Sequence, residues 1–259
     1  MNGSVGKAGV SARQGDPLSF DGASVLVVGG SSGIGNGIAR AFRDRDAQVT
    51  VWGTRASAAD YAGDTGSDLE GLNYVQVDVA DDAAVSRAAA AMPRLDVLVL
   101  SQGVVLYRRA EYEMPGFRKV LDVNLNSLMA CCVAFHPQLK AARGSVIILS
   151  STAAFHATRG NPGYAASKAG AVGLVRTLAD AWADDGIRVN GIAPGFVATK
   201  MTAVTTANPA RLEAALQRIP MGRLGTPQDM AGVALFLASP LAAYVIGHTV
   251  PVDGGLLLN

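Results

Sequence analysis

The stretch Val28-Gly29-Gly30-Ser31-Ser32-Gly33-Ile34-Gly35 lies between an apolar run that begins at Ser24 and a segment with helical periodicity. Glycines in such a place permit a tight turn, let the backbone approach a pyrophosphate group and let the helix pack closely on the strand. The N-terminus of the helix offers free N–H groups and a positive dipole end to phosphates. The position of this glycine-rich stretch between a strand and a helix therefore predicts a phosphate-binding turn.

Outward from this turn, short apolar runs alternate with longer helical segments. The apolar runs are Ser24–Gly29, Gln48–Trp52, Tyr74–Val77, Val97–Leu100, Ser145–Leu149, Arg188–Ile192 and Thr249–Val252. The helical segments are about Ile34–Arg45, Ala83–Met92, Tyr112–Leu139, Gly163–Asp184 and Pro227–Ala238. Continuous apolar runs are typical of strands that are buried on both faces of a parallel sheet. The pattern predicts a single α/β domain of Rossmann type: a doubly wound, seven-stranded parallel sheet with helices on both faces.

Two segments stand apart from this alternation. Met1–Phe20 is rich in glycine, serine and alanine, and we expect it to be a flexible arm in front of a domain that spans residues 21–259. The second segment, Thr199–Arg223, follows the sixth predicted strand. It could be a lid over a substrate, because ligands of open α/β sheets bind beyond the carboxyl ends of strands, or a surface excursion.

The composition excludes several classes of protein. The 259 residues carry 22 basic and 21 acidic side chains, a net charge of +1 that gives no support for binding nucleic acid or an anionic membrane. No run approaches the ~20 apolar residues of a membrane span. The adjacent Cys131 and Cys132 are expected to be core residues of a reduced, cytoplasmic protein. Because His136, His156 and His248 lack metal-ligand spacing, we expect no metal site.

The glycine spacing, with three residues between Gly29 and Gly33, resembles that of the short-chain dehydrogenase/reductase family, and the resemblance covers nearly all of residues 21–259. Further family motifs follow in order: Asp78-Val79, Asn124, Ser151, Tyr164 13 residues later, Lys168 four residues after that, Pro194-Gly195 with Thr199, and Asp253-Gly254-Gly255. Two positions depart from the family. Val28 stands where the family has threonine, and Leu100-Ser101-Gln102-Gly103 where it has Asn-Asn-Ala-Gly.

The resemblance implies an oxidoreductase with a defined set of site residues. The implied catalytic residues are Asn124, Ser151, Tyr164 and Lys168. The implied cofactor contacts are Gly29, Ser31, Ser32, Gly33, Ile34, Gly35, Thr54, Arg55, Asp78, Val79, Gly103, Tyr164, Lys168, Pro194, Gly195, Val197 and Thr199. In this family the aspartate at position 78 contacts adenine, Lys168 holds the nicotinamide ribose and Asn124 supports a water path. A homotetramer is also implied, and the tail Leu256-Leu257-Leu258 would suit a subunit interface.

The residue types themselves fit such chemistry. Tyr164 and Lys168 are four residues apart in a helical segment, so their side chains share a face. A free tyrosine has a pKa of about 10, and a neighbouring ammonium is expected to lower the pKa of Tyr164 toward the working range. Ser151, at a strand end, can donate a hydrogen bond to a substrate oxygen that develops negative charge. In reduction, Tyr164 would then protonate the carbonyl oxygen.

The end of the second predicted strand favours NADP(H) over NAD(H). The family places a carboxylate 18 residues after Gly35 when it binds NAD, and that position holds Gly53. Thr54 and Arg55 could instead hold a 2′-phosphate, which suits the fork of an arginine. The alternative is that Arg55 points to solvent.

Late-chain motifs, residues 194–199 and 222–227, resemble those of 3-oxoacyl-acyl-carrier-protein reductases. We therefore expect an enzyme that acts on a small-molecule carbonyl or secondary alcohol, with a 3-oxoacyl thioester as the leading substrate. A dehydrogenase of a sugar, steroid or small ketone is the alternative. A non-catalytic NADP(H)-binding redox sensor is a third hypothesis, against which the intact Ser151, Tyr164 and Lys168 argue. Arg108 and Arg109 are either a solvated pair or a patch for an anionic substrate or carrier.

Overall fold

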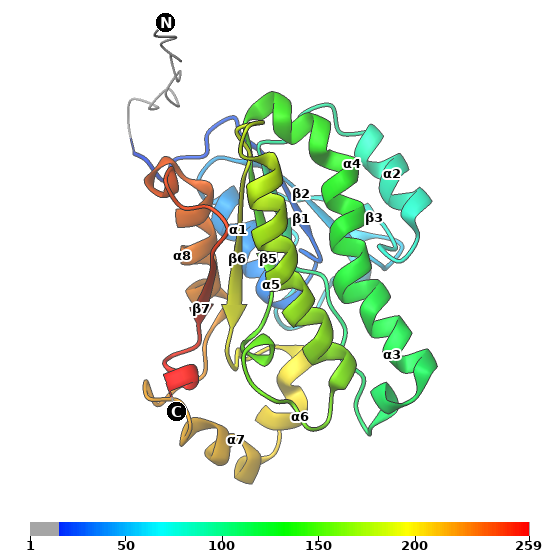
Figure 1. Ribbon diagram of the computed structural model, residues 1–259, viewed down its shortest axis with the longest axis vertical. Helices are drawn as coiled ribbons and strands as arrows, with labels where there is room; N and C mark the ends of the chain where they lie inside the picture. The colour runs from blue at the N-terminus through cyan, green and yellow to red at the C-terminus, as the bar shows by residue number, and fades with distance from the viewer. Residues whose placement is uncertain (1–15, 259) are drawn as a thin grey trace, which may run out of the picture.

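The computed structural model describes residues 16–258, which form a sheet of seven parallel strands flanked by helices (Figure 1). The strands are β1 Ser24–Val28, β2 Gln48–Gly53, β3 Asn73–Gln76, β4 Val97–Leu100, β5 Ser145–Leu149, β6 Arg188–Pro194 and β7 Thr249–Val252. Their order across the sheet is β3-β2-β1-β4-β5-β6-β7, so the direction of winding reverses between β1 and β4. This order confirms the predicted doubly wound, Rossmann-type sheet and marks the reversal point as the place for a ligand.

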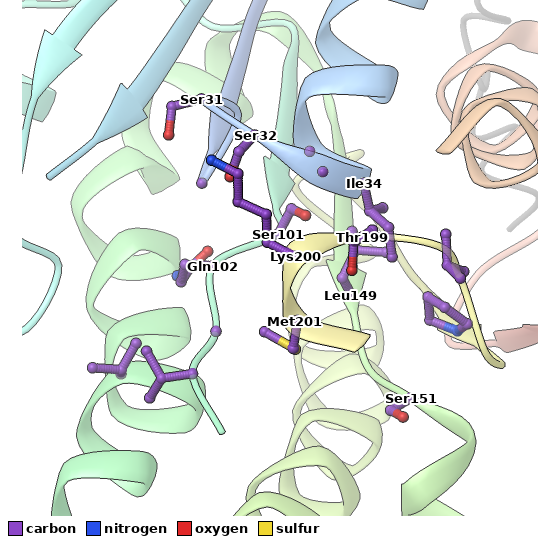
Figure 2. Close-up of a pocket in the computed structure, with 18 of the residues that line it drawn as sticks. Ser31, Ser32, Ile34, Ser101, Gln102, Leu149, Ser151, Thr199, Lys200 and Met201 are labelled. Atoms are coloured by element: carbon purple, nitrogen blue, oxygen red, sulfur yellow. The ribbon is translucent and has the colours of Figure 1, made fainter. Parts of the chain in front are cut away.

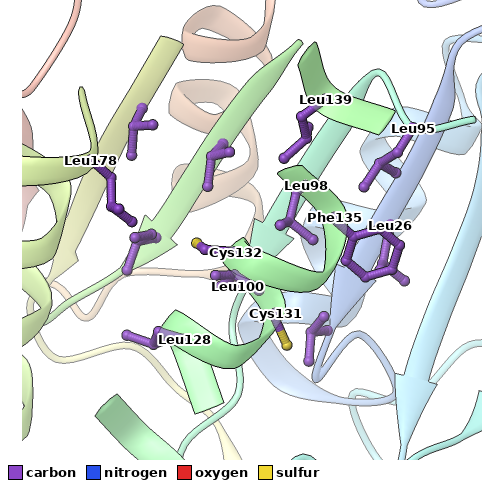
Figure 3. Packing of buried hydrophobic residues seen from close by; sticks show 14 of the residues in the cluster. Leu26, Leu95, Leu98, Leu100, Leu128, Cys131, Cys132, Phe135, Leu139 and Leu178 are labelled. Atoms are coloured by element: carbon purple, nitrogen blue, oxygen red, sulfur yellow. The ribbon is translucent and has the colours of Figure 1, made fainter. Parts of the chain in front are cut away.

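Helices cover both faces of the sheet. The helices of the described residues are α1 Gly33–Arg43, α2 Asp82–Ala90, α3 Met114–Leu121, α4 Ser127–Ala142, α5 Pro162–Trp182, α6 Ala203–Thr206, α7 Pro209–Leu216 and α8 Pro227–Ala238. Of these, α6 and α7 lie beyond the ends of the strands rather than on a face of the sheet (Figure 1). Within β1, Leu26 and Val28 belong to a core shared with α2, α4 and α5 (Figure 3). Val25 and Val27 face the other way, into a second core with α1 and α8. The continuous apolar runs of the sequence are therefore explained by two cores, one on each face of the sheet.

The two cysteines lie in the first core. Cys131 and Cys132, both in α4, are free and fully buried, as the sequence predicts. Burial raises the pKa of the Cys131 thiol to about 12. Both side chains therefore pack as small apolar groups rather than as thiolates.

The single helix predicted over Tyr112–Leu139 is wrong in one respect. A π-helical turn, Asp122–Asn126, separates α3 from α4, and a short 3₁₀ turn, η2 Ala110–Tyr112, precedes α3. The extra residue of a π turn rotates the side chains that follow it, and such turns are frequent at functional sites. Here the π turn contains Asn124, so the interruption sets the direction of a predicted site residue.

The ends of the chain also differ from expectation. Phe20, assigned to the flexible arm, is buried and packs edge to face on Phe42 with ring centres 4.7 Å apart, so the domain begins before residue 21. Residues 1–15 of the predicted arm lie outside the described residues. At the other end, Leu256 is buried in the chain's own fold and only Leu258 is strongly exposed, so most of the apolar tail has a place within the subunit.

The predicted lid segment, 199–223, leaves the carboxyl end of β6 and carries a 3₁₀ turn, η5 Lys200–Thr202, followed by α6 and α7. In Figure 1 these helices lie beyond the lower end of the sheet, at the side where the strands end. The segment returns to the domain at α8, where Arg223 binds both carboxylate oxygens of Asp229 at 2.7 and 2.9 Å. Across the described residues, no helix is long and apolar enough to cross a membrane.

Candidate active site

A cavity of about 360 Å³ opens at the carboxyl ends of the strands, beside the glycine turn (Figure 2). The predicted site residues that line it are Gly29, Ser31, Ser32, Gly33, Ile34, Gly35, Thr54, Val79, Gly103, Ser151, Tyr164, Lys168, Pro194, Gly195, Val197 and Thr199. Three others, Arg55, Asp78 and Asn124, lie outside this lining. The topology thus brings residues from the whole length of the chain to one cavity at the reversal point of the sheet.

The glycine turn is packed so closely that side chains would not fit. A Cβ atom on Gly35 would lie 2.3 Å from the carbonyl oxygen of Gly29, and a Cβ on Gly29 would lie 2.8 Å from the backbone nitrogen of Gln102. Gly29 and Gly33 also have positive φ angles, 75° and 57°. The turn therefore needs glycine for both space and backbone conformation, and it exposes the N-terminus of α1 to the cavity, as a phosphate site requires.

Asn124 lies behind the cavity wall and holds the wall in place. Its Oδ1 accepts the N–H of Val104 at 2.7 Å, and its Nδ2 donates to the carbonyl oxygen of the same residue at 2.9 Å. Nδ2 also lies 3.3 Å from the hydroxyl of Ser167 in α5. This side chain is fully buried, so in the structure it links the loop after β4 to α5.

Ser151, Tyr164 and Lys168 converge on the cavity from two elements. Ser151 lies two residues after the end of β5 and is the N-cap of a 3₁₀ turn, η4 Thr152–Ala154, where its Oγ accepts the N–H of Ala153 at 3.1 Å. Tyr164 and Lys168 come from successive turns of α5, and both line the cavity. A serine hydroxyl, a phenol and an ammonium therefore surround one space, where they can donate hydrogen bonds and exchange a proton with a bound oxygen.

The expected lowering of the Tyr164 pKa by Lys168 is wrong for this structure. Burial raises the pKa of the Tyr164 phenol above its usual value and outweighs the hydrogen bond from Ser151, which lowers it. The Lys168 ammonium is also buried, which lowers its own pKa to about 8. It donates a hydrogen bond to the carbonyl oxygen of Leu149 at 2.8 Å and lies over the Tyr164 ring, 5.6 Å from its centre.

The end of β2 is crowded by neighbouring side chains at Gly53, the position where the family places a carboxylate for NAD. A Cβ on Gly53 would lie 2.7 Å from the Tyr61 hydroxyl and 2.8 Å from the Ser31 Oγ. Thr54 lines the cavity. Among the described residues that line this cavity there is no aspartate or glutamate, whereas Lys168 and Lys200 contribute positive charge. The site is therefore electrostatically suited to an anion.

Arg55 lies beside the cavity in a network of its own. Its guanidinium is 2.8 Å from the Asp64 carboxylate and 4.4 Å from the centre of the Tyr61 ring. The same carboxylate is 2.5 Å from the Lys200 ammonium, and these two cations lower the pKa of Asp64. Asp64 thus joins a predicted cofactor residue to the first turn of the lid segment.

Asp78 is exposed, and its Oδ1 accepts the N–H of Ala80 at 3.0 Å. Its neighbour Val79 lines the cavity instead.

Sequence reasoning missed several lining residues. They are Trp52, Gly53, Val77, Ser101, Gln102, Val104, Val123, Leu149, Ser150, Lys200, Met201 and Thr202. Most are neighbours in sequence of predicted residues, so a rule that includes the residues flanking each motif would have found them. Gln102 is different, because it lies where the family motif is lost. Its Nε2 donates to Ser127 at 2.9 Å, which fixes the loop after β4 against α4.

The comparisons with known proteins agree with this geometry. A family model described as Enoyl-(Acyl carrier protein) reductase matches residues 28–257. The 3-oxoacyl-[acyl-carrier-protein] reductase of Chlamydia muridarum is 36% identical over 244 residues, which are 90% of this chain and 96% of that protein. The 2-dehydro-3-deoxy-D-gluconate 5-dehydrogenase of Bacillus subtilis is 35% identical over 93% of this chain and 97% of its own. The Pseudomonas aeruginosa RhlG/NADP active-site complex has a TM-score of 0.84 at 34% identity, covering 92% of this chain and 98% of that one.

Proposed function

The chain belongs to the short-chain dehydrogenase/reductase family and is an NAD(P)-dependent oxidoreductase of CH–OH and C=O groups, and we propose that Ser151, Tyr164 and Lys168 carry its chemistry. The observation that carries this proposal is their convergence on the cavity beside the glycine turn. The same cavity fits the cofactor. The glycine turn leaves no space for side chains at Gly29 and Gly35, so its backbone is open to the phosphates, and no lining residue among those described is acidic.

When bound, the nicotinamide supplies or accepts the hydride. In reduction, the Tyr164 hydroxyl gives its proton to the substrate oxygen, and in oxidation the phenolate removes the alcohol proton. Ser151 donates a hydrogen bond to the same oxygen as negative charge develops on it. The residues that would hold the cofactor are the glycine turn at the phosphates, Val79 on the adenine side and Lys168 at the nicotinamide ribose.

The preferred cofactor is NADP(H). Three observations support this preference: the crowded space at Gly53, the nearby Arg55 guanidinium and the Lys200 ammonium at the cavity wall. A 2′-phosphate can replace Asp64 as the partner of these two cations, because phosphate oxygens accept charge-assisted hydrogen bonds as carboxylates do. A relative of known structure, RhlG, is described as a complex with NADP.

The leading substrate is a 3-oxoacyl thioester. Apolar Val104 and Met201 line the cavity. Arg108 and Arg109, both with positive φ angles, lie in the loop that contacts the lid segment through the Tyr107 hydroxyl and the Met201 carbonyl oxygen. Apolar side chains in this part of the cavity wall, with arginines on the adjoining loop, suit an acyl chain on an anionic carrier group. A second candidate, a sugar acid, is favoured by the gluconate-type relative, and it would also use the arginines.

A substrate panel tests these proposals. NADPH oxidation would be followed by its absorbance with acetoacetyl-coenzyme A, a longer 3-oxoacyl thioester, a 2-dehydro-3-deoxy sugar acid and a neutral ketose. We expect the highest kcat/KM with the longer thioester. Highest activity with the sugar acid would move the assignment to the second candidate, and preference for the neutral ketose would contradict both.

The proposal also covers the oligomeric state of the protein and its cellular compartment. We propose a cytoplasmic homotetramer, as the family resemblance implies. The exposed apolar side chains Phe236, Leu241, Tyr244, Ile246 and Leu258, toward the C-terminal end of the chain, support burial between subunits. Sedimentation of the protein as a monomer would contradict the proposed homotetramer.

A further inference from the structure

Glu111, a residue outside every motif considered above, is almost completely buried in the turn η2 after β4. One of its carboxylate oxygens accepts the backbone N–H of Tyr164 at 2.8 Å. The other accepts the N–H of Leu106 at 3.0 Å and the side-chain amide of Asn161 at 3.1 Å. A carboxylate is rarely buried without such partners, because its charge must be compensated by donors. Glu111 therefore joins the loop after β4 to the start of the helix that bears Tyr164.

The start of α5 shows why a partner from outside the helix is needed. Asn161 is the N-cap residue, but its side chain makes no capping hydrogen bond. Its amide is used instead on Glu111 and on the carbonyl oxygen of Leu106, the latter at 3.0 Å. Tyr164 is the third residue of the helix, so its N–H has no partner within the helix. Glu111 satisfies this N–H and puts a negative charge at the positive end of the helix dipole.

We propose that Glu111 is a positioning residue for Tyr164: its carboxylate fixes the first turn of α5 against the loop after β4 and so sets where the phenol stands in the cavity. This inference rests on the proposed function, in which Tyr164 exchanges the proton. The space around the contact is small, since a Cβ on Gly163 would lie 3.3 Å from the same carboxylate oxygen. A side chain of another length or acceptor pattern would shift the turn.

The negative charge of Glu111 also affects the pKa of Tyr164, and this effect can be measured. The polar and charged groups near Tyr164 are Ser151 at the N-cap of η4, Lys168 from α5, Tyr107 from the loop after β4 and Glu111 from η2. Burial raises the pKa of the phenol most, the hydrogen bond with Ser151 lowers it, and Tyr107 and Glu111 raise it further. Removal of the negative charge at position 111 is therefore expected to lower the pKa of Tyr164.

The test compares Glu111→Gln with Glu113→Gln, which changes an exposed glutamate at the start of α3, two residues further along. Glutamine has one acceptor oxygen, so it cannot receive all three donors. We expect Glu111→Gln to lower kcat about 10- to 100-fold, the cost of a small misplacement, while the Kd of NADPH measured by fluorescence changes less than about twofold. In alcohol oxidation, the rising limb of its pH profile is expected to move to lower pH. The control variant should match the wild type in all three measurements.

A second variant, Asn161→Ser, disturbs the position of the Glu111 carboxylate without removing its charge. It also provides a test of the proposal if Glu111→Gln does not fold. It removes the amide that holds Glu111 but keeps a capping residue and the carboxylate. We expect a lower kcat with an unchanged pH profile. Wild-type kcat in Asn161→Ser, or wild-type kcat and pH profile in Glu111→Gln, would overturn the role of Glu111. The variant Tyr164→Phe distinguishes this failure from failure of the proposed function, because retained turnover in Tyr164→Phe would contradict the function itself.

Discussion

Burial raises the pKa of the Tyr164 phenol above its usual value, which favours the protonated form of the phenol in the cavity. In the proposed mechanism, reduction uses the protonated phenol and oxidation uses the phenolate. The rate of reduction is therefore expected to be level through neutral pH and to fall only in the alkaline range. The rate of oxidation is expected to rise from neutral pH through the alkaline range. Profiles of kcat in both directions, from about pH 6 to about pH 11, check this prediction. A fall of the oxidation rate above neutral pH would contradict it.

Arg55 provides a second prediction at the scale of single residues. Its present partner is the carboxylate of Asp64, and in the NADP complex a 2′-phosphate would take that place. Arg55→Ala is expected to reduce kcat/KM for NADPH about 10- to 100-fold, the value of a charge-assisted hydrogen bond, and to leave the constant for NADH unchanged. Arg87→Ala, on the exposed side of α2, is the matched control. An equal loss for both cofactors would show that Arg55 supports the fold rather than the phosphate.

The sequence was informative about single residues where a motif has a fixed spacing. Ser151, Tyr164 and Lys168 were predicted together, and all three line the cavity. The direction of the Tyr164 pKa shift was not predictable, because it depends mainly on burial of the phenol, which the spacing of the motif does not encode. Glu111 was missed for a similar reason. Its partner Tyr164 is 53 residues away, and no local pattern distinguishes a buried glutamate from a solvated one.

Among the elements, the contact between α1 and α8 places the glycine turn. A Cβ on Gly37 of α1 would lie 2.4 Å from the Cβ of Pro227, at the start of α8. Gly37→Ala is therefore expected to force the helices apart and to lower the free energy of unfolding by about 1–3 kcal/mol, as overpacking does. Gly232→Ala is the control, since a Cβ there meets nothing within 4 Å. Urea denaturation measures both, and a fully stable Gly37→Ala would contradict the proposed contact.

The elements themselves were largely predictable, with one instructive exception. Strands that are buried on both faces leave continuous apolar runs, and each of the seven predicted runs contains or overlaps a strand in the described residues. The π turn at Asp122–Asn126 was not predicted, because both sides of it have helical periodicity. It is stabilised by tertiary contacts of Asn124 with Val104 and Ser167, which a local pattern does not contain.

For the whole molecule, general rules of chain winding predict the order of the strands. The strand order in turn predicts the location of the site, at the point where the direction of winding reverses. Strand–helix alternation with right-handed crossovers leaves few topologies, and each places the strand ends at one edge. The substrate does not follow in this way. The cavity is bordered by Met201 from residues 199–223 and by Val104 from the loop after β4, and the two segments meet where the Tyr107 hydroxyl donates to the Met201 carbonyl oxygen. Such contacts between loops depend on side chains that no periodic pattern governs.

The most direct test of the account is turnover by Tyr164→Phe with the best substrate of the panel. The change removes one oxygen atom, so the Kd of NADPH is expected to stay within about twofold of the wild-type value. Turnover is expected to fall about 10²- to 10⁴-fold, the usual contribution of a positioned proton donor. Turnover close to that of the wild type, with NADPH still bound, would contradict the assignment of Tyr164 as the group that exchanges the proton.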